Sequence, residues 1–118
     1  KSIRWMTSVT TNHPIHIMKL VKKVSPKSIL EAVSEVSGFS IKELSTGTNR
    51  GTVSDWRHIG MFISREHGLT LAEAGELFGR HFTTVTAAER RVRAKLKDES
   101  VQSAIELVND FLEKQQNE

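Results

Sequence analysis

The feature that most constrains the fold of this chain is the spacing of its apolar residues, which recur at intervals of three and four along most of the sequence. This spacing places apolar side chains on one face of an α-helix, and the alternating pattern of half-buried strands is missing. The sequence therefore predicts an all-α fold, a compact helical bundle. The 118 residues suffice for one domain, and a hydrophobic fraction of 37% can fill one small core.

Cap and stop signals divide the first half of the pattern into elements. Ser25, followed by proline, is a good N-cap and starts a helix that we expect to end at Gly38. Ser40 and Glu43 have the spacing of a capping box, in which each side chain bonds to the other residue's backbone N–H. They predict a short helical turn that ends near Leu44.

Similar signals follow in the second half. After a loop rich in Gly, Thr and Asn, Thr52 repeats the cap signal and starts a helix that ends at Gly68. Thr70 and Glu73 form the clearest capping box in the chain, and the short helix that they open is closed by Gly79.

Two further helices complete the expected bundle. Thr83 and Thr84 start a helix that runs to about residue 97, and Ser100 caps the last helix. The apolar stripes that should dock these two helices are Val85, Ala88, Val92 and Leu96, then Val101, Ala104, Ile105, Val108, Phe111 and Leu112.

The net charge of +3 is the sum of segregated blocks. Residues 1–24 carry bases without acids and are interpreted as a basic N-terminal arm or linker, with room for one short helix; residues 25–116 form the main domain. A second basic run lies in the helix that starts near Thr83, whereas the chain after Asp98 is mostly acidic. Such segregation fits one surface that faces a polyanion and one that turns away, although solvated helix faces would give the same pattern.

Several classes of function are excluded or disfavoured. Without cysteine there is no disulfide, thiolate metal site or Cys nucleophile, and the five histidines are scattered, so we expect no enzyme, cofactor or metal. The apolar runs fall far short of the roughly 20 residues that cross a bilayer, and no signal peptide opens the chain. We therefore expect a cytoplasmic protein without a membrane partner.

A short capped helix, a tight turn and a basic second helix that begins with hydroxyl residues are typical of a helix-turn-helix. The DNA major groove admits one α-helix, whose first turns meet base edges while cations hold phosphates. Thr83 and Thr84 could contact thymine methyl groups or phosphates, and Thr83 could equally be the N-cap of its helix. Arg90 and Arg91 lie further along the helix, where phosphates are the better partners.

These residues carry a resemblance to a known family. Residues 74–80, 83–85 and 88–92 read Ala-Gly-Glu-Leu-Phe-Gly-Arg, Thr-Thr-Val and Ala-Glu-Arg-Arg-Val. They resemble the signature of the C-terminal DNA-binding domain of the bacterial replication initiator DnaA. Residues 57–63, Arg-His-Ile-Gly-Met-Phe-Ile, are similar to its R-Q-I-A-M-Y-L helix. The resemblance covers most of the chain, from about Ser25 to Leu112.

The resemblance implies a helical domain similar to the Trp repressor, which reads a double-stranded DNA site in the major groove and reaches the neighbouring minor groove with a basic loop. It also implies that the helix at about 83–97 is the recognition helix. The residues expected to contact DNA are Arg50, Arg57, Arg80, His81, Thr83, Thr84, Arg90 and Arg91.

The chain also departs from the family. One glycine of the signature is missing, and the Asp-His pair that helps the family to read bases is replaced by His81 and Phe82. Phe82 could pack on a thymine methyl group or fill the core beneath the turn. We therefore expect DNA binding with altered base readout; the alternative is a non-catalytic helical module that binds protein and has lost base-specific readout.

No phosphate-binding loop of the G-x-x-x-x-G-K-[ST] type occurs in the sequence, so the ATPase domain of a full initiator is absent from it. We expect either a fragment or a free-standing relative, with an ATPase or transposase domain as the partner domain in a full-length protein.

Overall fold

The structure is a computed structural model that describes residues 24–47 and 51–116. These residues form six α-helices and no strand, which confirms the all-α prediction. The short helix expected within residues 1–24 lies outside the described residues. The helices are α3 (Pro26–Ser37), α4 (Ile41–Thr46), α5 (Gly51–Glu66), α6 (Leu71–Leu77), α7 (Phe82–Ala94) and α8 (Glu99–Gln116).

Three of the predicted helix starts are confirmed by their caps. The Ser25 side chain accepts a hydrogen bond from the backbone N–H of Ser28 at 3.2 Å. Ser40 and Thr70 each form a complete capping box with the glutamate three residues later. These bonds satisfy backbone N–H groups that have no partner within the first turn of a helix.

Four other boundaries differ from the prediction. Helix α5 begins at Gly51, so Thr52 lies inside the helix and is not its cap. Helix α7 is capped by His81, which makes Thr83 a helical residue, and it ends at Ala94 instead of residue 97. At α8 the cap is Asp98, whose carboxylate accepts from the backbone N–H of Ser100 at 2.9 Å and from its hydroxyl at 2.8 Å.

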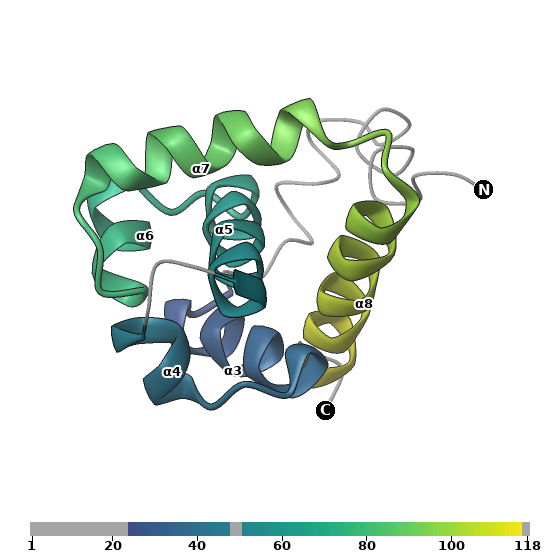
Figure 1. The fold of residues 1–118 in the computed structure, drawn as a ribbon. Coiled ribbons are helices and arrows are strands. Elements are labelled where there is room, and N and C mark those ends of the chain that lie inside the picture. The colour runs from purple at the N-terminus through teal and green to yellow at the C-terminus, as the bar shows by residue number, and fades with distance from the viewer. Residues whose placement is uncertain (1–23, 48–50, 117–118) are drawn as a thin grey trace, which may run out of the picture.

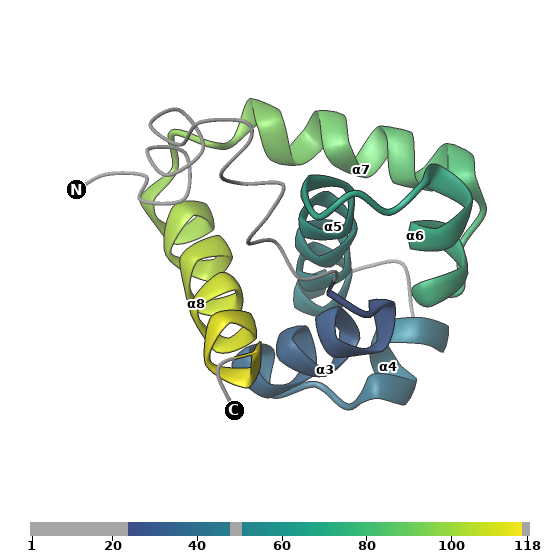
Figure 2. The same ribbon diagram turned by 180° about the vertical axis from the view of Figure 1, so that it is seen from behind.

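Helix α5 runs through the middle of the fold, and most of the other helices pack against it (Figure 1). Helix α7 lies across one end of α5, with α6 beneath its N-terminal half, and α8 descends from its C-terminal end. Both views place α3 at the opposite side from α7, between α4 and α8 (Figure 2). One long face of α7 is therefore turned away from the bundle.

The core forms where α5 meets the other helices. Of the predicted stripe, Val85, Ala88 and Val92 are buried and dock α7, whereas Leu96 lies beyond the end of the helix and is half-buried. Gly60 of α5 allows the fully buried ring of Phe78 to lie against the helix backbone, because a Cβ atom there would overlap that ring. This contact fixes the turn between α6 and α7 on α5. No helix in the described part of the chain is long and apolar enough to cross a membrane.

Candidate nucleic-acid interface

Helices α6 and α7 and the four residues between them form the predicted helix-turn-helix. Gly79 has φ +65°, a left-handed conformation that glycine adopts at no steric cost, and its Cα lies against the Ser45 carbonyl where no Cβ would fit. The backbone N–H of Arg80 donates to the Gly75 carbonyl at 2.8 Å. The turn is therefore closed although one glycine of the family signature is missing.

The first turn of α7 is held by His81. Its Nδ1 accepts from the backbone N–H of Thr83 at 3.3 Å and lies 2.9 Å from the Thr83 hydroxyl. Thr83 is exposed and Thr84 half-buried. Both hydroxyl residues thus lie at the leading end of the helix, where the helix-turn-helix reading of the sequence requires them.

Arg80 joins the turn to the end of α4. Its Nη2 donates to the Gly47 carbonyl at 2.7 Å and its Nη1 to the Gly79 carbonyl at 3.1 Å. The side chain is half-buried, so part of this cation stays at the surface while the carbonyls fix its direction.

Arg57 lies deeper than the resemblance suggests, because its side chain is only 1% exposed. Its Nε donates to the Leu44 carbonyl at 2.6 Å and its Nη2 to the Glu43 carbonyl at 3.0 Å. Burial, and secondly the nearby charge of Arg80, lowers the pKa of Arg57 below its ordinary value, although a guanidinium stays protonated in proteins. The cation therefore joins α5 to the C-terminal end of α4, where helix carbonyls favour positive charge.

Arg90 and Arg91 are both exposed, and within the described residues neither has an ion-pair partner. The neighbouring acid, Glu89, is the only one on α7. Its Oε2 lies 3.4 Å from Nε of Arg65 and 3.8 Å from Nη2 of Arg93. The negative charge on this helix is therefore already paired. Arg50, the remaining predicted arginine, lies outside the described residues.

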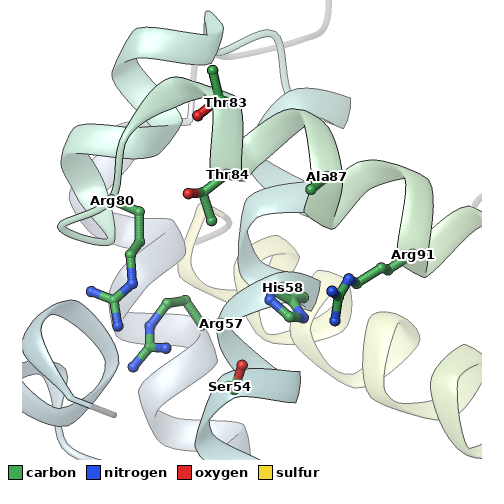
Figure 3. A pocket seen from close by; sticks show the side chains of 8 residues that line it. All are labelled: Ser54, Arg57, His58, Arg80, Thr83, Thr84, Ala87 and Arg91. Carbon is green, nitrogen blue, oxygen red and sulfur yellow. The ribbon is translucent and has the colours of Figure 1, made fainter. Parts of the chain in front are cut away.

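An open cleft between α5 and α7 brings several of these side chains together, as Figure 3 shows. We call it the α5–α7 cleft; its volume is about 370 Å³, and three arginines, a histidine and hydroxyl groups line it without any carboxylate. Most ligand pockets of this size are largely apolar, so this lining suits an anion better than an apolar small molecule. The lining residues are Ser54, Arg57, His58, Arg80, Thr83, Thr84, Ala87 and Arg91.

His58 and Ser54 belong to this cleft but were not predicted from the sequence. Desolvation, and then the positive charge of Arg91, lowers the pKa of His58, whereas Asp55 opposes the shift. The spacing of Ser54, Arg57 and His58, three and four residues apart, places them on one face of α5. The recurrence of polar residues at that spacing was the signal available in the sequence.

Two further observations concern the exposure of Phe82 and the potential for metal binding. Phe82 is 48% exposed, so of its two predicted roles the one that fills the core beneath the turn is wrong. Within residues 24–47 and 51–116, His, Cys, Asp and Glu side chains form no group of three that could hold a metal ion.

Comparison with known proteins identifies the family. The family model for the helix-turn-helix of the bacterial DnaA protein matches residues 26–92. The chromosomal replication initiator protein DnaA of Mycoplasma capricolum is 34% identical over 87 residues, which cover 71% of this chain and 19% of that protein. The DnaA of Picosynechococcus sp. is 29% identical over 89 residues, which cover 73% of this chain and 20% of that protein. The chain thus spans about a fifth of these relatives, and residues 26–92 place it in the bacterial DnaA helix-turn-helix family.

Proposed function

We propose that this chain binds double-stranded DNA, with the outward face of α7 in the major groove and a backbone phosphate at the α5–α7 cleft. The observation that carries the proposal is the cleft itself, which gathers cations and hydroxyl groups without a carboxylate beside the exposed start of α7. Phosphate contacts of this kind position a protein on the duplex, and the adjacent helix then meets base edges. Membership of the DnaA helix-turn-helix family supports this arrangement.

The predicted residues take different roles in this proposal. Arg91 at the cleft and Arg90 on the outward face of α7 neutralise phosphates, because they are exposed and their neighbouring acid is already paired. Thr83 and Thr84 meet a base edge or a phosphate at the leading end of the helix. Arg80 presents its half-buried guanidinium at the rim of the cleft.

The other predicted residues act at different levels of the interface. His81 orients the first turn of α7 through its bond to Thr83. Arg57 supports the floor of the cleft through its bonds to α4. Arg50 is proposed as the minor-groove residue of the basic loop on the resemblance alone.

The proposal is limited to a binding module without catalysis. The relatives are named chromosomal replication initiators, so replication origins are natural duplexes to test. The replaced Asp-His pair leads us to propose a base readout that differs from the family's standard one. An ATPase or transposase domain remains the proposed partner domain in a longer protein.

The test is a fluorescence-anisotropy titration with duplexes selected from a random pool, repeated at several salt concentrations. Each phosphate contact contributes about −0.9 to the slope of log K against log[salt]. Arg90→Ala and Arg91→Ala should each weaken binding to all duplexes and flatten the slope by about 0.9. Lys114→Ala, which removes an exposed cation from the far end of α8, is the matched control and should leave the slope unchanged.

The alternative, a protein-binding module, has one observation in its favour. Leu107 is 54% exposed on α8, whose charged residues are mostly acidic, and an apolar partner surface could cover it there. If the unmodified chain binds no duplex at low salt, DNA binding is refuted and this alternative is favoured.

A further inference from the structure

An aromatic pair stands at the leading edge of α7. The rings of His81 and Phe82 are stacked with their centroids 4.4 Å apart and 29° between their planes. His81 is fixed by its bonds to Thr83, so the pair has a defined position although Phe82 is 48% exposed. Among the described residues, the only other large apolar side chains with comparable exposure are Ile41 and Leu107.

The side chains that follow Phe82 lack the groups that usually read bases by paired hydrogen bonds. Residues 82–88 are Phe-Thr-Thr-Val-Thr-Ala-Ala, without an amide, carboxylate, guanidinium or ammonium group. Asn and Gln read adenine, Arg and Lys read guanine, and Asp and Glu accept from cytosine. The first two turns of α7 can use none of these pairings. What they present is an aromatic ring, methyl groups and hydroxyls.

This chemistry matches one feature of the major groove, the methyl group on C5 of a pyrimidine. We propose that Phe82, oriented by its stack on His81, is a specificity-determining residue that reads a C5 methyl group. Thr86, four residues later and also exposed, lies on the same side of α7 as Phe82. The family's polar pair at this position is thereby replaced by an apolar reader. The inference rests on the proposed DNA binding.

Charge complementarity indicates that a duplex, and not an apolar protein surface, covers this aromatic pair. Arg90 follows two turns later on the outward side of α7, and Arg91 lines the α5–α7 cleft. The only acid on the helix, Glu89, is paired with Arg65 and Arg93. Phe82 is thus the apolar tip of a helix on which the charges without an ion pair, Arg90 and Arg91, are positive.

Thymine and 5-methylcytosine both carry this methyl group, and the experiment must separate them. The probe is a duplex selected by the unmodified chain from a random pool. Each thymine is replaced in turn by uracil, which lacks only the methyl group, and affinity is measured by fluorescence anisotropy. At the pyrimidine that Phe82 contacts, we expect uracil to weaken binding about fourfold, because the burial of one methyl-sized apolar group is lost.

The variant Phe82→Ala should bind the thymine and uracil duplexes equally well at that position. Leu107→Ala removes an equally exposed apolar side chain from α8 and should keep the fourfold difference. At the same position, 5-methylcytosine is also compared with cytosine. A gain with 5-methylcytosine supports reading of the methyl group in either base, whereas a gain with thymine alone supports reading of thymine.

The inference is overturned if the chain binds the selected duplex and no thymine-to-uracil change alters its affinity. It is also overturned if Phe82→Ala, shown by circular dichroism to be folded, preserves the thymine-to-uracil ratio. A chain that binds no duplex overturns the proposed function and this inference with it, so the two failures are distinguishable.

Discussion

Arg57→Ala should lower the free energy of unfolding by about 3 kcal/mol, because Arg57 holds α4 against α5. Its two bonds to the Leu44 and Glu43 carbonyls are 2.6 and 3.0 Å long. Hydrogen bonds that involve a charged group contribute about 1.5–3 kcal/mol each, and the cost of burying the guanidinium offsets part of their sum. We therefore take the lower end of the roughly 3–6 kcal/mol that two such bonds supply.

The assay is urea unfolding followed by circular dichroism at 222 nm. For an m-value of about 2 kcal/mol/M, the expected loss moves the midpoint down by about 1.5 M. Arg57→Lys keeps the charge with a single nitrogen, so we expect about half of this loss. Arg90→Ala, at an exposed position, is the control and should change stability by less than about 0.5 kcal/mol.

The result that would refute this reasoning is specific. If Arg57→Ala unfolds at the same urea concentration as the unmodified chain but binds duplex DNA at least tenfold more weakly, Arg57 serves DNA directly. The carbonyl bonds to α4 would then contribute little to stability.

Two further predictions concern packing and pH. Gly60→Ala should destabilise the fold by about 1–3 kcal/mol, because the added Cβ overlaps the buried Phe78 ring. At an open helix position the same change stabilises by about 0.5–1 kcal/mol, so a raised Tm would contradict this prediction. The folded-state pKa of His58 lies below its ordinary 6.5, so the unfolded chain takes up this proton first and stability is lost as pH falls below about 6.5. Tm measured at pH 7.5 and 5.5 should therefore drop less for His58→Gln than for the unmodified chain, and equal drops would show that His58 is not the group responsible.

The parts of the fold that could be predicted are those that depend on neighbouring residues. The caps at Ser25, Ser40 and Thr70 are bonds between residues three apart, so both partners are visible in the sequence. The buried stripe of α7 also follows from its own spacing. Interactions between residues close in sequence were therefore enough to predict the helices and the succession of helix, turn and helix.

The start of α7 shows where local patterns fail. Phe82 lies three residues before Val85, a spacing that would place it on the buried stripe, but it is the first residue of the helix and its ring packs on His81. Histidine is also an unusual cap beside two threonines that could have served. The choice among adjacent caps depends on how the turn packs against α4 and α5, which the local sequence does not contain.

Arg57 shows a second kind of limit. A fully buried arginine is rare unless it is paired, and its partners here are backbone carbonyls 13 and 14 residues away. Every residue has a carbonyl, so no sequence pattern marks these two as partners. The resemblance assigned this arginine to DNA contact, and only the fold shows what its guanidinium binds.

The two arginines nearest each other in the cleft can coexist because both bind the end of α4. Arg57 binds the Glu43 and Leu44 carbonyls, and Arg80 binds the Gly47 carbonyl, so the negative end of a short helix offsets their mutual repulsion. The cations are thereby oriented before any phosphate arrives, which reduces the entropy that binding would cost. Loss of Arg57 should consequently weaken both stability and DNA affinity, since Arg80 would lose its support. Loss of Arg91 should weaken affinity alone, and comparing the two variants separates the floor of the cleft from the rim that we propose to bind phosphate.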